Sequence, residues 1–149
     1  MPSMSAERVT LDTNVLVYAI DRDAGERHGR AAALVDQAVD LDCVLTLQAL
    51  SEFYFAVTRK GKMPARDAAA QVEDWQQLFP TVAAKPAALP HALAAAREHS
   101  LSFWDAMLWA TAREAGVTVL LSENFQDGRE LGGVRFRNPF TTTWGSGQG

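Results

Sequence analysis

The sequence predicts an α/β fold in which helices cover a small parallel sheet. Short apolar segments alternate along the chain with longer segments of helical periodicity, the pattern of strands joined by helical crossovers. The chain has 149 residues, of which 48% are hydrophobic and 21% charged, so it is long and apolar enough to form one folded domain. We expect this domain to span residues 1–140, followed by a flexible C-terminal tail over 141–149.

In the first part of the chain, apolar runs alternate with polar turns. The run before Asp12 is short and ends at a charge, as a buried strand does, and apolar residues recur at helical spacing between positions 31 and 38. The elements expected here are a strand at 8–11, a helix at 14–20, a polar turn at 21–29, a helix at 30–39 and a strand at 43–45.

In the second part, Gly and Pro mark where the helices end. Gly61 and Pro64 separate two helices, Pro80 ends the second of them, and Gly116 ends the last. Residues 117–121 are β-branched and apolar between turn signals, which makes them the clearest strand. The expected elements are helices at 48–59, 65–78, 87–99 and 102–114, strands at 81–82, 117–121 and 134–136, and a loop at 124–133.

Composition excludes several classes of protein. The net charge of −4 argues against a protein that coats nucleic acid non-specifically, because such proteins are usually basic. No apolar run is long enough to predict a transmembrane helix, and the first residues lack the pattern of a secretory signal. Cys43 is the only cysteine, so we expect a small buried thiol, no internal disulfide and a cytoplasmic location.

Three carboxylates stand where apolar surroundings are expected. Asp12 follows the first strand, at the edge of a parallel sheet where ligands bind. Glu52 and Asp105 each lie in a helix that is apolar on nearly all sides, so neither has an easy route to bulk water. Structural alternatives stay open: Asp12 as a helix N-cap, Glu52 on a helix surface, and Asp105 in a capping box with Ser102.

A cluster of these acids would require a compensating cation. Like charges brought together repel one another, and burial removes their hydration. No Lys or Arg is a sequence neighbour of any of the three, so a hard divalent ion is the natural partner. Mg²⁺ is expected, and Mn²⁺ fits the same oxygen ligands. Zinc is not expected, because His28, His91 and His99 have no metal-ligand spacing.

Several segments occur together in a specific order and spacing. They are LDTNVLVYA at 11–19, LSEF at 50–53, FWDA at 103–106, LLSENFQDG at 120–128 and NPF at 138–140. Over residues 9–140 the chain resembles the PIN-domain ribonucleases, and most closely the VapC-type toxins of prokaryotic toxin–antitoxin pairs. The resemblance implies a PIN-like three-layer α/β/α fold with a small parallel central sheet.

The resemblance also implies metal-dependent endonucleolytic cleavage of RNA. Asp12, Glu52 and Asp105 match the family's first three acids; Asp12 and Asp105 would hold Mg²⁺, and Glu52 would ligate the ion or orient its waters. The metal would lower the pKa of a water that attacks the phosphate in line. A homodimer and a cognate antitoxin that blocks the site are implied as partners.

The chain departs from the family pattern at the fourth acid. This acid commonly stands two residues after a Ser or Thr, here Ser122, and that position holds Asn124. An Asn oxygen can still serve a metal or its waters, and Glu123 and Asp127 are near enough in sequence to substitute. The number of metals and the catalytic rate therefore stay open.

Polar and basic residues near the acids are further candidates. Thr13, Asn14 and Ser122 are candidates for hydrogen bonds to ligands or phosphate, although local turn bonding explains them equally well. The basic cluster after residue 58 could guide an RNA backbone, or could simply be a solvated helix end. This cluster comprises Arg59, Lys60, Lys62 and Arg66, and weaker candidates of the same kind are Arg113 and Arg129.

Some apolar side chains are expected in the core, and others suggest a surface that contacts a partner. Trp104 and Trp109 are expected in the core. The apolar residues at 15–20 and 34–39 exceed what a small sheet obviously needs, and suggest a surface for self-association or for a partner helix.

Other functions also stay open. A haloacid-dehalogenase-type phosphatase places an Asp nucleophile after the first strand, but Asn14 stands where its second Asp is needed. With Asn124, the chain could be a non-catalytic module that binds RNA or protein. A DNA-cleaving nuclease is a further alternative, because a metal ion held by carboxylates does not by itself distinguish the deoxyribose of DNA from the ribose of RNA.

Overall fold

The structure is a computed structural model that describes residues 7–141. Its main sheet has the strand order β1-β4-β6-β5, formed by β1 (Val9–Leu11), β4 (Val119–Leu121), β6 (Val134–Arg137) and β5 (Glu130–Leu131). β1, β4 and β6 run parallel, whereas β5 pairs antiparallel with β6. The short strands β2 (Leu45–Thr46) and β3 (Thr81–Val82) form a second parallel pair, connected to β1 by a bridge between Val9 and Cys43.

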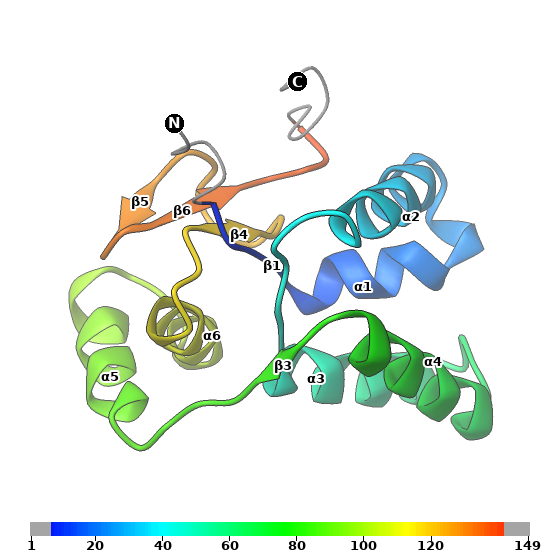
Figure 1. Cartoon of the computed structure of the whole chain (residues 1–149), viewed down its shortest axis with the longest axis horizontal. Coiled ribbons are helices and arrows are strands. Elements are labelled where there is room, and N and C mark those ends of the chain that lie inside the picture. The colour runs from blue at the N-terminus through cyan, green and yellow to red at the C-terminus, as the bar shows by residue number, and fades with distance from the viewer. Residues whose placement is uncertain (1–6, 142–149) are drawn as a thin grey trace.

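Helices cover both faces of this sheet (Figure 1). They are α1 (Thr13–Ile20), the short 3-10 helix η2 (Arg22–Ala24), α2 (Glu26–Ala38), α3 (Leu47–Arg59), α4 (Ala65–Leu78), α5 (Ala88–Glu98) and α6 (Phe103–Glu114). In Figure 1, α5 and α6 lie together on one side, and α1 to α4 lie on the other. None of the described helices is long and apolar enough to cross a membrane.

Alternation along the strands produces two apolar cores. Leu11 and Leu121 face the core shared with α1 to α4, whereas Leu120 and Phe136 face the core shared with α5 and α6. Successive strand residues point to opposite faces of a sheet, so one short strand can supply both cores. The three-layer α/β/α arrangement predicted from the sequence is therefore confirmed.

Most predicted elements are present, and the main differences occur at turns. Helix α2 begins at Glu26 instead of residue 30, because Gly25 adopts a positive φ of 67° after η2 and lets the chain enter the helix early. The predicted loop at 124–133 contains β5, which forms a hairpin with β6. Strand β2 begins at Leu45, and Cys43 contributes only the bridge to β1. Of the predicted tail, residues 142–149 lie outside the described part of the chain.

The cysteine is buried as predicted, but one tryptophan is not. Cys43 is 3% exposed, and burial raises the pKa of its thiol to about 12, so it is an unreactive core residue. Trp109 is buried, whereas Trp104 is 61% exposed and the prediction of a core position was wrong. Residues 108–112 of α6 are all buried, whereas Trp104 lies in the first turn of this helix, where its neighbours Phe103 and Asp105 are only partly buried.

The two apolar segments singled out in the sequence contribute mostly to the core. Most apolar side chains at 15–20 and 34–39 pack into the first core, where α1 and α2 contact each other and the sheet, although Val39 is 44% exposed. Helix α3 also exposes large apolar side chains, namely Leu47, Tyr54 and Phe55. Although its sequence is apolar on nearly all sides, α3 is exposed along one side, because it forms part of an outer layer.

Candidate active site

Asp12 lies at the carboxyl end of β1, beside the end of β4. The parallel register pairs Leu11 with Leu121, and the Asp12 backbone N–H donates to the Leu121 carbonyl at 2.9 Å. Its side chain caps α1, since Oδ1 accepts from the Thr13 backbone N–H at 2.7 Å. The other carboxylate oxygen, Oδ2, accepts from Ser122 Oγ at 2.7 Å and from Asn14 Nδ2 at 3.4 Å. The N-cap role is thus real, and it fixes the carboxylate at the sheet edge.

The Asp12 carboxyl group is difficult to ionise. It is 5% exposed, and burial raises its pKa from 3.8 to about 6. The hydrogen bonds from Ser122 and Thr13 favour the ionised form and lower the pKa, whereas the charges of Asp105 and Glu52 raise it. All three carboxylates are therefore close enough to interact.

Glu52 reaches this edge from α3, whose first turn is capped by Thr46 Oγ1. Its Oε1 accepts from Thr13 Oγ1 at 3.1 Å, and its Oε2 accepts from Gln48 Nε2 at 3.2 Å. Gln48 also donates to the Trp104 carbonyl at 3.0 Å. Glu52 is thus half-buried and turned toward the start of α1, while Gln48 connects it to the start of α6.

Asp105 comes from the opposite helical layer. It lies in the first turn of α6, where Ser102 Oγ accepts from the Asp105 backbone N–H at 3.2 Å, as predicted for a capping box. Burial raises the pKa of Asp105, a hydrogen bond with Ser102 lowers it, and the charge of Glu52 raises it further. The capping role and the proximity to the other acids therefore hold together.

The segment after β4 forms hydrogen bonds with the Asn14 side chain through Ser122 and Glu123. Ser122 Oγ accepts from Asn14 Nδ2 at 3.2 Å and from the Asn124 backbone N–H at 3.0 Å. Asn124 itself is exposed. Thr13, Asn14 and Ser122 thus bond directly to the acids or to one another across the sheet edge, besides making local turn contacts.

The two acids near Asn124 are both engaged with basic side chains. Glu123 pairs with Arg27 Nε at 3.0 Å and accepts from the Tyr18 hydroxyl at 2.5 Å. Asp127 Oδ1 accepts from the Asn138 backbone N–H at 2.9 Å and lies 3.4 Å from Arg137 Nε. Each carboxylate therefore already holds a loop in place.

Sequence reasoning missed Gln48, Tyr18 and Arg27. Gln48 precedes Glu52 by one helical turn, so helix spacing could have indicated that contact. Arg27 also lies over the rings of Tyr18 and Phe140, with centroid distances of 5.8 and 5.5 Å. These contacts join α1, α2 and the segment after β4, and no local sequence signal indicates them.

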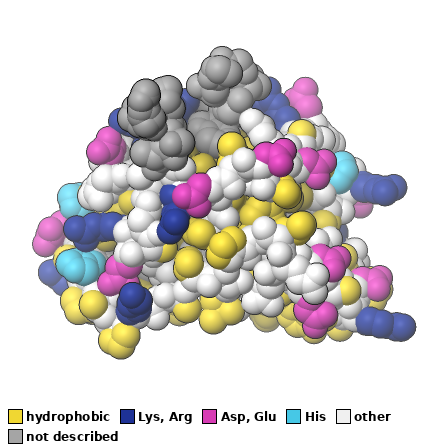
Figure 2. Space-filling view, viewed as in Figure 1, with side chains coloured by type: hydrophobic (Ala, Val, Ile, Leu, Met, Phe, Trp, Pro, Cys, Tyr) yellow, Lys and Arg dark blue, Asp and Glu magenta, His cyan; other side chains and the backbone are white. Residues whose placement is uncertain are grey.

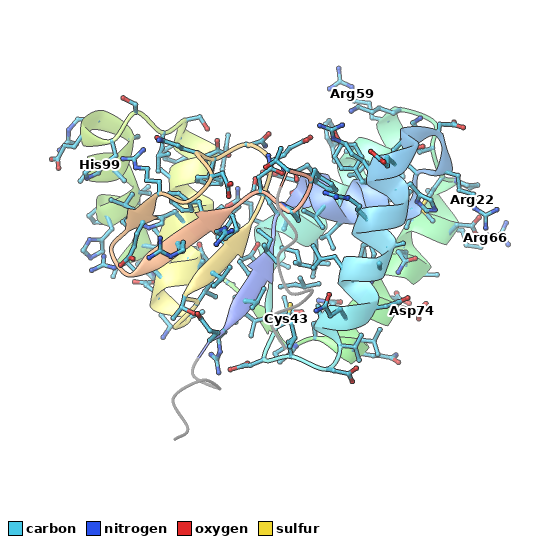
Figure 3. The ribbon with its side chains drawn as sticks, turned by 90° about the horizontal axis from the view of Figure 1, so that it is seen from above. Arg22, Cys43, Arg59, Arg66, Asp74 and His99 are labelled. Atoms are coloured by element: carbon cyan, nitrogen blue, oxygen red, sulfur yellow. The ribbon has the colours of Figure 1, made fainter. Side chains whose placement is uncertain are left out.

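The basic residues proposed for RNA contact have diverse surroundings. In Figure 3, β1 points toward the edge of the molecule at which Arg59 lies. Arg59 covers the Phe55 ring at 5.5 Å, and Lys60 is exposed. Lys62 pairs with Asp21 at 3.2 Å, which neutralises much of its charge. Figure 2 shows acidic and basic side chains interspersed on the face in view.

The three acids offer carboxylate oxygens that no basic side chain of the described residues neutralises. Within residues 7–141, no Lys or Arg forms an ion pair with Asp12, Glu52 or Asp105. No three His, Cys, Asp or Glu side chains of that range are already gathered tightly enough to hold one ion. Mg²⁺ is typically bound by one or two carboxylates and several waters, so the set fits this ion without requiring three direct ligands.

Comparison with known proteins extends this description. The family model of the PIN domain matches residues 9–126. The fold is similar to VapC20 from Mycobacterium tuberculosis, a toxin that cleaves the sarcin-ricin loop, at 18% identity and a TM-score of 0.59, covering 75% of this chain and 86% of that one. No curated protein sequence matches the chain.

Two toxin–antitoxin complexes show the same architecture. VapBC2 from Rickettsia felis, bound to promoter DNA, is 12% identical with a TM-score of 0.66, covering 88% of this chain and 98% of that one. VapBC-1 from nontypeable Haemophilus influenzae is 15% identical with a TM-score of 0.64, covering 91% and 99%. At such identities the likeness concerns the fold.

Proposed function

The chain belongs to the PIN domain family, and on this premise we propose that it is a Mg²⁺-dependent endoribonuclease, the toxin of a toxin–antitoxin pair. The observation that carries the proposal is the convergence of Asp12, Glu52 and Asp105 at the carboxyl end of the parallel strands, with no basic side chain of the described residues paired to them. The family match favours this function over the phosphatase alternative.

In this proposal each carboxylate has a distinct role. Asp12 and Asp105 hold the ion from the two helical layers, and Glu52 ligates it or orients its waters. Ser122, Thr13 and Asn14 position the Asp12 and Glu52 carboxylates through the hydrogen bonds described above. When bound, Mg²⁺ or Mn²⁺ stabilises charge that develops on the scissile phosphate and promotes attack by water.

Residues around the three acids have supporting roles in the same proposal. Asn124 stands at the position of the fourth acid and offers a neutral oxygen at the rim. Glu123 and Asp127 hold the surrounding loops, through Arg27 and Arg137 respectively. Arg59 and Lys60 are the stronger candidates for RNA contact, because Lys62 is already paired with Asp21.

A cognate antitoxin protein and a second copy of the chain are the proposed partners. The apolar groove between α3 and α4, lined by Leu47, Leu50, Tyr54 and Val72, suits a partner helix and lies on the helix that carries Glu52. Ser51, the residue before Glu52, also lines this groove, so an occupant there would contact the helix that carries this acid. We place the activity in the cytoplasm, where RNA substrates are available.

Cleavage of a labelled RNA pool tests the proposal directly. Purified protein is assayed with Mg²⁺, with Mn²⁺ and with chelator, beside Asp12→Asn purified in the same way. We expect cleavage that requires metal and disappears in Asp12→Asn. Metal-independent cleavage, or equal cleavage by the variant, would indicate a contaminant and remove the support for this function.

A catalytically attenuated binding module is the second candidate, because an amide replaces the fourth acid. If neither protein cleaves the pool, Asn124→Asp distinguishes the explanations. Gain of activity in this variant would show a site weakened by Asn124. Continued inactivity together with RNA binding would favour the binding module.

A further inference from the structure

Trp104 is a large, exposed aromatic side chain that directly precedes Asp105 in the first turn of α6. It is 61% exposed, whereas a tryptophan is usually well buried. The Phe103 ring contacts it edge-on, with centroids 4.8 Å apart and an interplanar angle of 71°. The indole is therefore supported from one side and open to solvent on the other.

The position of Trp104 is tied to two of the carboxylates. It immediately precedes Asp105, so their Cα atoms are about 3.8 Å apart. Its carbonyl accepts from Gln48 Nε2 at 3.0 Å, and the same amide nitrogen donates to Glu52 Oε2 at 3.2 Å. One side chain thus holds the backbone under the indole at a fixed place relative to Glu52.

A hollow of about 380 Å³ opens beside the indole, between α3 and α6. Its walls are mostly apolar, and polar groups are found at intervals along it. The lining includes Leu47, Gln48, Ser51, Trp104, Met107 and Thr111. The Gln48 amide nitrogen donates to Glu52 and to the Trp104 carbonyl, so a further hydrogen bond to this side chain would have to be accepted by its Oε1.

We propose that Trp104 and this hollow form a subsite for an unpaired base of the nucleic acid, next to the phosphate held at the carboxylates. The inference rests on the proposed nuclease function and adds the place at which this chain would hold a base, at the exposed indole of Trp104. A base presents a flat π face and a polar edge, and these match an indole with Gln48, Ser51 and Thr111 nearby. Stacking on aromatic side chains is a general way to bind single strands.

The charges around the hollow favour a base over the backbone. The lining contains no Lys or Arg, so the hollow itself offers no cation that would attract a phosphate group. A contact here therefore has to be non-ionic, in contrast to contacts made by Arg59 or Lys60. The apolar groove proposed above for a protein helix is a different one, between α3 and α4.

Binding of two oligomers that differ only in their bases tests the subsite. Fluorescein-labelled oligoadenylate of about eight nucleotides is compared with an abasic oligomer of the same backbone, by anisotropy in Ca²⁺ buffer, with oligomer integrity checked on a gel. We expect the protein to bind oligoadenylate roughly 10-fold more tightly. Trp104→Ala should weaken that binding roughly 10-fold and leave abasic binding unchanged.

Two further variants and salt sharpen the result. Trp104→Phe keeps an aromatic face and should retain most of the preference, whereas Leu89→Ala, an exposed leucine on α5, should change nothing. The preference should persist between about 50 and about 200 mM salt, since stacking releases no counterions. Thermal unfolding confirms that each variant is folded.

Three outcomes would overturn the subsite. In the first, the native protein binds both nucleic-acid probes equally, and in the second, Trp104→Ala keeps the preference for oligoadenylate. In the third outcome, Trp104→Ala changes the number of protein chains in the assembly and leaves nucleic-acid binding unchanged. The last would assign Trp104 to a protein interface. Cleavage of the RNA pool is scored separately. Base preference in a protein that stays inactive even as the Asn124→Asp variant would keep the subsite and remove the nuclease. Cleavage that is equal in Trp104→Ala and in the native protein would keep the nuclease and remove the subsite.

Discussion

Among single residues, Asp12 is where stability and the proposed function oppose each other. A buried carboxylate that accepts from Ser122, Thr13 and Asn14 is precisely oriented, but its ionised form has lost most of its hydration. The negative charges of Glu52 and Asp105 repel the ionised Asp12 carboxylate and raise its pKa further. A bound cation would remove this penalty, so the residue favours metal binding at the expense of the metal-free fold.

Asp12→Asn should stabilise the metal-free protein at neutral pH. The pKa of Asp12 is about 6 in the folded state, against 3.8 for an ordinary Asp side chain, so the folded state binds the proton more tightly. Stability from this group therefore falls as pH rises between these values. The variant should gain up to about 3 kcal/mol at pH 7 to 8, and the gain should vanish near pH 4. Urea unfolding in chelator at both pH values measures it. A variant less stable at pH 8 would show that the lost hydrogen bonds outweigh the burial penalty.

Ser122→Ala should move the pH dependence of metal binding. The Ser122 hydroxyl donates to Asp12 Oδ2 and lowers the pKa of that carboxyl, so its removal raises the pKa further. Metal binding requires the ionised form, and Mg²⁺ affinity should fall roughly 10-fold at pH 6 but little at pH 8. Calorimetric titration at both pH values measures this, with Ser51→Ala on exposed α3 as control. An equal loss at both pH values would indicate that Ser122 acts on geometry instead.

The candidate acids could be predicted from the sequence because each stands out locally. Asp12 ends an apolar strand, and Glu52 and Asp105 interrupt apolar helices. The hydrogen bonds from Tyr18 and Arg27 to Glu123 could not be predicted, because they join residues about a hundred positions apart. The exposure of Trp104 was mispredicted for a related reason: an apolar run does not reveal which side of a helix meets solvent.

At the scale of elements, boundaries were predictable where a turn residue stops a helix. Pro64 and the segment before Pro80 bracket α4, whose observed bounds match the expected 65–78. The start of α2 was missed because it depends on the backbone conformation of Gly25, which a sequence permits but does not dictate. The hairpin of β5 and β6 was missed because β5 is only two residues long.

The two glycines in the turn of the β5–β6 hairpin should differ in how much an alanine destabilises the protein. Gly132 and Gly133 connect the strands with φ of 55° and 87°, as a two-residue turn with left-handed residues requires. A Cβ on Gly132 would lie 3.0 Å from Trp109 Cζ2 and 3.1 Å from Arg113 Nε, whereas one on Gly133 meets nothing within 4 Å. Gly133→Ala should therefore destabilise the protein by about 1 kcal/mol through backbone strain alone, and Gly132→Ala by about 2–3 kcal/mol. Thermal melts of both variants measure the difference, and equal losses would show that Trp109 shifts freely.

For the whole molecule, the site is a junction between the two cores. Asp12 and Glu52 are fixed by elements of the first core, while Asp105 begins the helix that packs into the second. The fold thus draws like charges together from opposite layers of the sandwich. Their repulsion weakens the junction until a cation joins the layers.

Mg²⁺ should accordingly raise the melting temperature of the whole domain. At a tenfold excess over its Kd, mass action adds about 1.4 kcal/mol, or roughly 3–6 °C for a chain of this size. Differential scanning calorimetry with Mg²⁺ and with chelator measures the shift, which Asp12→Asn should abolish. Asp127→Asn is the matched control: its carboxylate bonds Asn138 and lies beside Arg137, so it should lower the basal melting temperature and keep the Mg²⁺ increment. Loss of the increment in this control would make Asp127 a ligand of the ion, and would place the missing fourth acid there instead of at Asn124.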